Sequence, residues 1–220
     1  MRIFPAPHAQ SSDDLISLFS EIDDLVTGYH IDIMDGQFVP AHTGSAQLTN
    51  QIDTLTENIL WVHLMANNPR AYMTELEVKP GSIITFHYEA VLPTDLEQLS
   101  EYCEQRQWRP SLALNPETPL IDVGHLLHYF DQITIMTVNP GASGQLFISS
   151  CLEKIEHLVA YRAAQEASFE IAVDGGITRD IITQLALLNV DAVATHSAVF
   201  ENQLPRQNLK TLLTHLNSVK

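Results

Sequence analysis

The sequence predicts one α/β domain, residues 1–220, folded as a (β/α)8 barrel. Eight short apolar segments alternate with segments whose apolar residues recur at helical spacing. Such alternation favours parallel strands joined by right-handed helical crossovers, and 220 residues is a usual length for a single closed barrel. An open doubly wound sheet is the alternative arrangement of the same elements. No internal repeat, low-complexity stretch or Pro/Gly/Ser-rich linker indicates a second domain.

Each strand is predicted from a short apolar run. In chain order these runs are Arg2–Phe4, Gly28–Asp32, Leu60–Leu64, Ser82–His87, Pro110–Leu114, Gln132–Met136, Glu170–Val173 and Asp191–Thr195. The helices are predicted from apolar stripes with a period of about 3.6. Three such stripes are Leu15/Leu18/Phe19/Ile22/Leu25, Ile181/Ile182/Leu185/Leu188 and Leu209/Leu212/Leu213/Leu216. Thr94 with Glu97, and Ser150 with Glu153, have capping-box spacing, which predicts helix N-termini there.

The formal net charge of −16 arises from 11 basic and 27 acidic residues. This balance argues against nucleic acids and membrane surfaces as partners, because both need clustered Lys and Arg. A small anionic substrate is compatible with it, since backbone N–H groups can hold a phosphate. Neither a secretory leader nor a membrane-spanning apolar run is evident, so we expect a cytoplasmic protein. Cys103 and Cys151 lack disulfide or metal-site spacing and are expected to pack inside.

Polar residues recur at the ends of the predicted strands. Asp32, His63, His87 and Asp174 each fall at the C-terminal end of a separate predicted strand, as does Met136. The carboxyl ends of barrel strands form the face on which active sites are built. One buried histidine there is most often a hydrogen-bonded structural residue. Several acids and imidazoles at one face instead favour a bound metal or substrate, because burying an uncompensated charge is costly.

His30 and Asp32 are two residues apart, so strand alternation directs both side chains to the same face. With His63 and Asp174 they form a candidate two-histidine, two-carboxylate metal site. These nitrogen and oxygen donors suit one divalent Zn, Fe or Mn ion better than Ca²⁺ or Mg²⁺. Spacing alone does not bring the four together, so their convergence is a hypothesis. Asp35 follows the strand in an Asp-Gly turn and is interpreted as a turn residue near the site.

Six segments of the chain read HIDIMDGQFVP, VHLM, ITFHYEA, LALNPETPL, IMTVNPGASGQLFI and VDGGI. In this order and at this spacing they resemble the signatures of the ribulose-phosphate 3-epimerase family. The resemblance implies a TIM barrel that uses a divalent metal to epimerise C3 of a ketose phosphate. The implied reaction converts D-ribulose 5-phosphate to D-xylulose 5-phosphate, or acts on a related ketose phosphate. It also implies an isomerase that assembles as a homo-oligomer and takes a small phosphorylated sugar as its substrate.

Carried over by position in these segments, the implied metal ligands are His30, Asp32, His63 and Asp174. Asp32 and Asp174 are also the implied catalytic acid/base pair. Two carboxylates suit this chemistry, because inverting a carbon beside a carbonyl needs a proton removed from one face and returned on the other. The implied substrate contacts are Met34, Met65, Met136, Gly141, Ser143, Gly144, Gly175, Gly176, His196 and Ser197. The three methionines are equally compatible with filling the core.

The substrate loops depart from the family pattern. The usual GFGGQ is GASGQ here, with Ala142 and Ser143, while His196 replaces a glycine after the last strand. Ala6 replaces a serine after the first strand, and Ala41 an asparagine. A side chain at position 196 narrows access to the backbone, although the N–H remains and an imidazole can itself donate a hydrogen bond. Because the metal and proton-transfer positions are kept, the pattern indicates changed specificity, for example toward a ketohexose 6-phosphate.

Two other interpretations remain. A non-catalytic sugar-phosphate binding or regulatory protein on the same barrel would also explain the altered loops. A phosphate-binding barrel with decarboxylase chemistry would need a lysine among the strand-end polar residues, and none of the predicted strands ends in one. His87 and Glu89, in the segment FHYEA, are compatible either with supporting the metal ligands or with simple packing.

Overall fold

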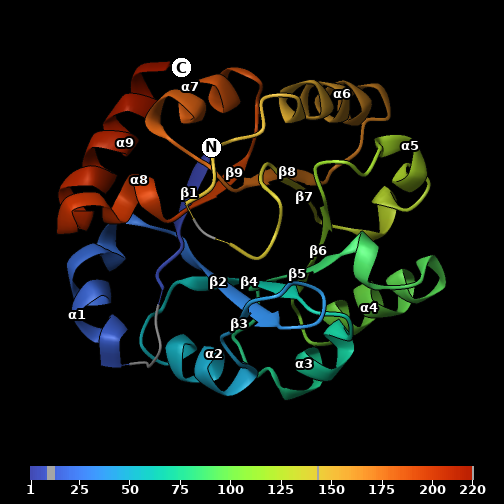
Figure 1. Ribbon diagram of the computed structural model, residues 1–220, viewed down its shortest axis with the longest axis horizontal. Helices are drawn as coiled ribbons and strands as arrows, with labels where there is room; N and C mark the ends of the chain where they lie inside the picture. Colours follow the sequence, from blue (N-terminus) through green and yellow to red (C-terminus); the bar gives the residue numbers. More distant parts are fainter. Residues whose placement is uncertain (9–12, 143, 220) are drawn as a thin grey trace.

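The strands form one curled sheet at the centre of the molecule (Figure 1). The structure is a computed structural model that describes residues 1–8, 13–142 and 144–219. Its strands are β1 (Arg2–Pro5), β2 (Gly28–Asp35), β3 (His42–Thr43), β4 (Ile59–Met65), β5 (Ile83–His87), β6 (Arg109–Leu114), β7 (Gln132–Met136), β8 (Glu170–Asp174) and β9 (Ala192–Thr195). The eight predicted strands are confirmed, within three residues at every end.

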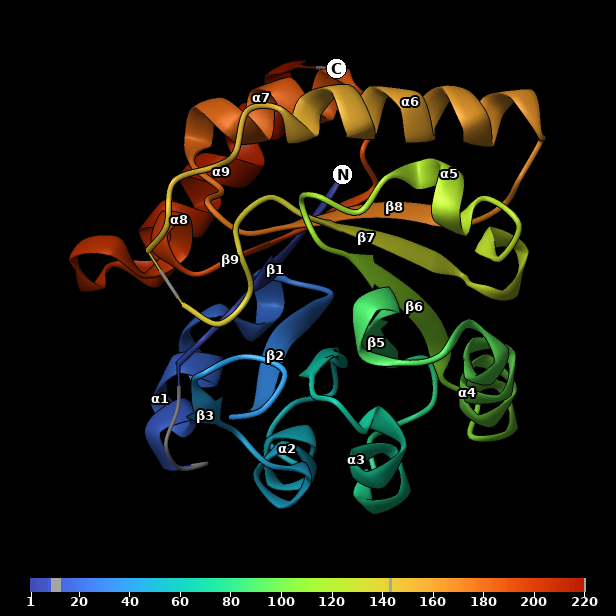
Figure 2. The ribbon, with the colours of Figure 1, turned by 45° about the vertical axis from the view of Figure 1, so that its right-hand side comes forward.

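Helices surround this sheet in chain order (Figures 1 and 2). They are α1 (Asp13–Ile22), α2 (Ala46–Asp53), α3 (Pro69–Glu75), α4 (Pro93–Gln105), α5 (Leu120–Val123), α6 (Cys151–Ala164), α7 (Arg179–Leu187), α8 (Ser197–Phe200) and α9 (Pro205–Val219). Short 3-10 turns are η1 (Asp23–Leu25), η2 (Tyr88–Ala90), η3 (Leu127–Tyr129) and η4 (Glu201–Gln203). Within the described residues, no helix combines the length and apolar character needed to span a membrane.

The sheet closes on itself. Hydrogen-bonded neighbours follow the order β1-β9-β8-β7-β6-β5-β4-β2-β3, and β1 also lies against β2, which joins the two ends of the parallel series. Every pairing is parallel except that of β3, which runs antiparallel to the end of β2. The (β/α)8 prediction is therefore confirmed, and the open doubly wound alternative is wrong.

The two predicted capping boxes are wrong. Helix α4 begins one residue earlier, at Pro93, so Thr94 lies inside its first turn and no side chain caps it; proline is favoured at that first position. Ser150 does precede α6, but its backbone is already helical, with φ −64° and ψ −18°, and its hydroxyl makes no cap hydrogen bond. Ser45 and Thr178 are true side-chain caps, of α2 and α7.

Side-chain alternation along β2 separates the core from the barrel interior. Tyr29, Ile31 and Ile33 belong to the large apolar core, which also contains residues of the surrounding helices. Between them, His30 points to the other face, where its ring contacts Trp61 edge-on at 4.6 Å between centroids. Asp32 follows on the same interior face. The pleat of one strand thus directs two polar groups inward, as predicted from their spacing.

A small apolar cluster fills the barrel beneath these polar groups. Its buried members are Phe4, Trp61, Ile83, Ala172, Ala192 and Ala194. The Trp61 indole N–H donates a hydrogen bond of 2.7 Å to the hydroxyl of Thr85, and both residues are fully buried. This interior packing closes the barrel at that level and supports the residues at the carboxyl ends of the strands.

Candidate active site

Two histidines and two aspartates lie together at the carboxyl ends of β2, β4 and β8. One donor atom from each of His30, Asp32, His63 and Asp174 lies within 4.8 Å of the others. His30 Nε2 is 3.1 Å from Asp32 Oδ1 and 3.5 Å from Asp174 Oδ2. His63 Nδ1 is 3.1 Å from Asp174 Oδ2 and 3.4 Å from Asp32 Oδ1. The convergence that spacing alone left open is therefore present, and we call these four residues the acid–imidazole cluster.

Strand register explains the convergence. Asp32 is the direct partner of His63 across the parallel pair β2–β4, and Asp174 is level with Met136 across β7–β8. The end of β8 is held by Thr137, whose backbone N–H donates to the Asp174 carbonyl at 2.8 Å. The Thr137 hydroxyl also bonds this carbonyl and that of Gly175. These bonds fix the backbone that carries one of the two acids.

The cluster is strongly coupled electrostatically. Burial alone would raise the pKa of Asp32, but the imidazoles of His30 and His63 outweigh it and hold the pKa well below its ordinary value. Burial alone would lower the pKa of His63, but hydrogen bonds to Asp174 and Asp32 outweigh it and raise the pKa to about 9. Positive charge is therefore favoured between the two carboxylates.

The donor chemistry of the cluster fits a divalent metal ion. Two imidazole nitrogens and two carboxylate oxygens face one small volume, and the His30 and His63 side chains are at most 1% exposed. A cation at this place would supply the positive charge that protonated imidazoles otherwise provide. The cluster can hold a metal ion, as the sequence predicted.

A chain of hydrogen bonds continues from the cluster away from the cavity. His63 Nε2 lies 2.9 Å from His87 Nε2, and His87 Nδ1 lies 3.3 Å from Glu89 Oε2. Glu89 also accepts from the Asn115 backbone N–H at 2.8 Å and from the Thr118 hydroxyl. An ionised carboxylate only accepts, so His87 donates through Nδ1 and accepts from His63 Nε2. Of the two alternatives for His87 and Glu89, the structure favours support of the cluster.

A cavity of about 260 Å³ opens above the cluster. It is bordered by the loop that follows β7, drawn in yellow across the ring of strands in Figure 1. The predicted site residues that line it are Asp32, Asp174, Met34, Met65, Met136, Gly141, Gly144, Gly175, Gly176, His196 and Ser197. The other two, His30 and His63, are buried members of the cluster, while Ser143 lies outside the described residues.

Backbone conformation and close packing require glycine at positions 175 and 176. Their φ values are +108° and +65°, in a region that favours glycine. A Cβ at Gly175 would lie 2.4 Å from a methyl of Val138, and one at Gly176 would lie 2.4 Å from the backbone nitrogen of Phe147. Both glycines therefore let the loop after β7 approach the end of β8 closely, which shapes the cavity wall.

Two polar residues of the cavity were missed from the sequence. His8 follows β1 in a Pro- and Ala-rich segment, and its ring stacks on His196 with centroids 3.9 Å apart. Gln145 donates to the carbonyls of Asn139 and Ala142, which fixes the loop after β7. His8 lies four residues after the predicted strand Arg2–Phe4, too far along the loop for the strand-end signal that identified Asp174.

Asp35 has the modest role predicted for it. Its Oδ1 accepts from the backbone N–H groups of Gln37 and Phe38, both at 2.8 Å, and its Oδ2 accepts from that of Asn67, also at 2.8 Å. It thus ties the turn after β2 to the loop after β4. Both cysteines are free and buried, as expected.

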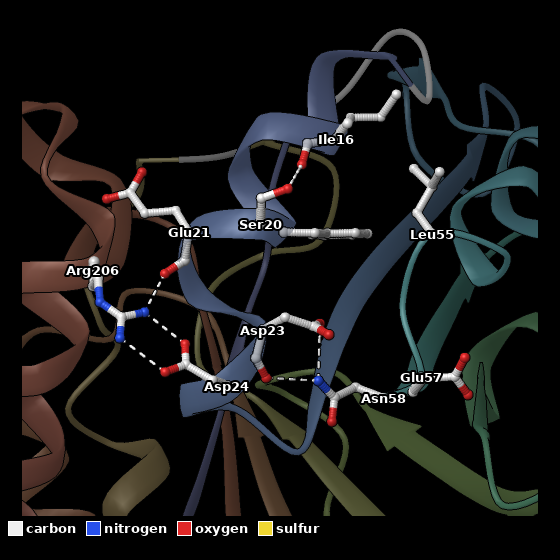
Figure 3. Close-up of a pocket in the computed structure, with 10 residues that line it drawn as sticks. Ile16, Ser20, Glu21, Asp23, Asp24, Leu55, Glu57, Asn58 and Arg206 are labelled. Atoms are coloured by element: carbon white, nitrogen blue, oxygen red, sulfur yellow. Dashed lines mark hydrogen bonds and ion pairs between the residues drawn. The ribbon is translucent and has the colours of Figure 1, made fainter.

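A larger open hollow, about 820 Å³, lies at the amino ends of the strands (Figure 3). Its one arginine and two of its aspartates already have partners within the protein. Arg206 makes two hydrogen bonds to the Asp24 carboxylate, at 2.6 and 2.8 Å. Asp23 accepts from Tyr29, Thr56 and Asn58. None of the predicted site residues lines this hollow, whereas eleven of them line the smaller cavity.

The position of the cluster, at the carboxyl ends of the strands of a closed parallel barrel, is that of the active site in (β/α)8 enzymes. Among the described residues that line the cavity there is no lysine, which leaves the decarboxylase interpretation unsupported. A family model described as "Ribulose-phosphate 3 epimerase family" matches residues 2–200. The chain belongs to this family, and the resemblance seen in its six segments is confirmed.

Relatives agree with this assignment. A ribulose-phosphate 3-epimerase of Treponema pallidum is 33% identical over 175 residues, which cover 80% of this chain and 79% of the relative. One of Bacillus subtilis is 32% identical over 196 residues, covering 86% and 88%. These names bear out the prediction of an isomerase. A solved 3-hexulose-6-phosphate synthase from Salmonella typhimurium superposes over 100% of both chains with a TM-score of 0.73 but 15% identity, which supports the fold alone.

Proposed function

We propose that the protein is a metal-dependent 3-epimerase of a ketose phosphate, interconverting D-ribulose 5-phosphate and D-xylulose 5-phosphate or a related pair such as ketohexose 6-phosphates. One observation carries this proposal. Asp32 and Asp174 come from strands separated by β1 and β9 in the ring, yet both line one cavity and both contact the same imidazoles. Two acids delivered to one small molecule from different strands are what stereochemical inversion requires.

The proposed reaction moves one proton at C3. One of the two carboxylates removes the C3 proton, which leaves a planar enediolate, and the other returns a proton to the opposite face. A divalent Zn, Fe or Mn ion held by His30, Asp32, His63 and Asp174 would stabilise negative charge developing on the substrate oxygens. The protein holds these donors ready through strand register and through the His63–His87–Glu89 chain, which keeps a proton on His63 Nε2 and so reserves Nδ1 for the cluster.

The methionines would exclude water from the reacting carbon. Met65 and Met136 are 3% and 2% exposed and line the cavity together with Met34. Their thioether side chains offer an apolar, polarisable surface without a proton to donate. Such a wall would leave the two carboxylates as the proton carriers nearest the intermediate, which protects the stereochemistry of the product.

A non-catalytic sugar-phosphate binder is the second candidate, favoured by the changes at Ala6, Ala142 and His196, all of which line the cavity. Metal analysis of the purified protein and NMR detection of solvent deuterium entering C3 separate the two. We expect bound metal and exchange with at least one member of a panel of pentulose and hexulose phosphates. Binding without exchange across the panel would establish the binder instead. Light scattering of the same sample tests the expected homo-oligomer.

A further inference from the structure

The cavity has an acidic side and an imidazole side. Asp32 and Asp174 line it from β2 and β8, whereas His8 and His196 line it from the loops after β1 and β9. Among the described residues of its lining, these two histidines are the only side chains that can carry positive charge. An anionic group of a bound molecule is repelled by the carboxylates and attracted to any protonated imidazole. The charges therefore orient an anionic substrate along the cavity.

The two imidazoles are held in a fixed arrangement. Strands β1 and β9 are neighbours, with Pro5 opposite Thr195, and the Ala6 N–H donates to the Thr195 carbonyl at 3.0 Å. The rings of His8 and His196 stack with centroids 3.9 Å apart and planes 7° apart. His196 Nδ1 lies 2.8 Å from the carbonyl oxygen of Ala6. A carbonyl only accepts, so Nδ1 carries the proton and Nε2 is the nitrogen left for another partner.

A nearby anion would offset the repulsion between the protonated rings of His8 and His196. Partial burial and the neighbouring His196 lower the pKa of His8, although Asp32 opposes the shift. Two protonated imidazoles in a stack repel each other, and a dianion beside both rings would offset that repulsion. The charged groups that share the cavity lining with the pair are Asp32 on β2 and Asp174 on β8, and the apolar ring of Phe200 lies 5.1 Å from that of His196.

We propose that His8 and His196, with their imidazoles protonated, form an anion subsite that binds the terminal phosphate of the substrate through ring N–H groups, His196 using Nε2–H because Nδ1–H donates to Ala6. In this chain, the imidazoles at positions 8 and 196 would contribute phosphate contacts, and position 196 carries a glycine in the family pattern. The subsite would select ketoses with a terminal phosphate over uncharged ketoses. That the ligand is a sugar phosphate rests on the proposed function. That the site binds an anion rests on the geometry alone.

Two variants remove charge while keeping the local structure. His196→Asn places an amide N–H where Nδ1 donates to Ala6, but it removes Nε2. His8→Phe keeps a ring to stack but has no nitrogen. We expect each to lower kcat/KM for the ketose phosphate by roughly 10- to 100-fold, mainly through KM, as for loss of a charge-assisted hydrogen bond. The matched control, His157→Asn, changes an exposed histidine of α6 outside the cavity and should leave kcat/KM unchanged.

A binding measurement without turnover makes the outcome independent of the reaction. Inorganic sulfate, a dianion at constant charge between about pH 6 and pH 8, is titrated into the protein while histidine ring resonances are followed by NMR. We expect the signals of His8 and His196 to shift together, with tighter binding at the lower pH. Shifts in neither ring would overturn the subsite, as would unchanged KM in both variants of an active enzyme. Sulfate binding with no exchange in any ketose phosphate would instead refute the proposed function and leave the subsite standing.

Discussion

Replacing Asp174 with asparagine removes one proton carrier and one donor of the cluster while leaving the shape nearly unchanged. The Asp174 side chain is 16% exposed, and its Oδ2 lies 3.1 Å from His63 Nδ1. Loss of a positioned acid or base costs about 10²- to 10⁴-fold in rate, equivalent to about 3–5 kcal/mol of barrier. We therefore expect deuterium exchange at C3 of the best ketose phosphate to fall by at least two orders of magnitude.

The same substitution should weaken metal binding. The carboxylate oxygens of the cluster lie within 4.8 Å of each other, so their mutual repulsion is about 3 kcal/mol at an effective dielectric constant of about 20. A bound cation offsets this repulsion in the wild type, and Asp174→Asn removes both the repulsion and half of the anionic attraction for the ion. If the affinity falls about 100-fold, the stabilisation from saturating metal falls by about 2.7 kcal/mol, or roughly 5–10 °C of melting temperature.

The assay compares wild type, Asp174→Asn and Asp122→Asn, an exposed aspartate of α5 that serves as the matched control. Exchange at C3 is followed by NMR, and melting is measured with and without Zn²⁺, Fe²⁺ or Mn²⁺. The control should behave as the wild type in both measurements. Exchange within about threefold of wild type in Asp174→Asn, with the metal-dependent melting shift retained, would refute both assigned roles, because each requires the charge.

Three further substitutions test the supporting structure. Glu89→Gln should lower metal affinity roughly 10- to 100-fold in a chelator competition, because replacing the acceptor for His87 with an amide disturbs the orientation of His63. Unchanged affinity would mean that His87 and Glu89 only pack beside the cluster. Gly176→Ala should lower the free energy of unfolding by about 2–4 kcal/mol. The control Gly144→Ala should lower it by only about 1 kcal/mol, because a Cβ at that position meets nothing within 4 Å. Equal losses in urea titrations would contradict the close approach of the loop after β7 to Gly176. Trp61→Phe should cost about 2–3 kcal/mol by the same measurement, because it leaves a buried hydroxyl without its donor and opens a small void; a loss below half of that would count against the hydrogen bond.

The strands were predictable because both faces of each strand are buried, one in the barrel interior and one against the helices. Each strand is therefore apolar over most of its length. The two-residue strand β3 was not, since both of its residues are exposed and carry no periodic signal. Helix starts were harder, because the capping-box pattern at Thr94 competes with Pro93, which determines the first turn.

The acid–imidazole cluster was predictable for a related reason. Alternation within β2 and the strand-end positions of His63 and Asp174 determine the direction of each side chain, and the ring closure brings the strands together. His8 was not found, because its placement depends on a stacking partner almost the whole chain away. A loop residue has no periodicity, so no local pattern in PAPH indicates which way the imidazole points.

The pairing of β1 with β9 has a consequence for the order in which the protein matures during synthesis. His8 is synthesised well before its stacking partner, His196, which follows the last strand of the barrel. A nascent chain that has reached α7 contains all four members of the acid–imidazole cluster but lacks half of the histidine stack. The assembled cavity therefore becomes complete only when the final strand docks beside the first.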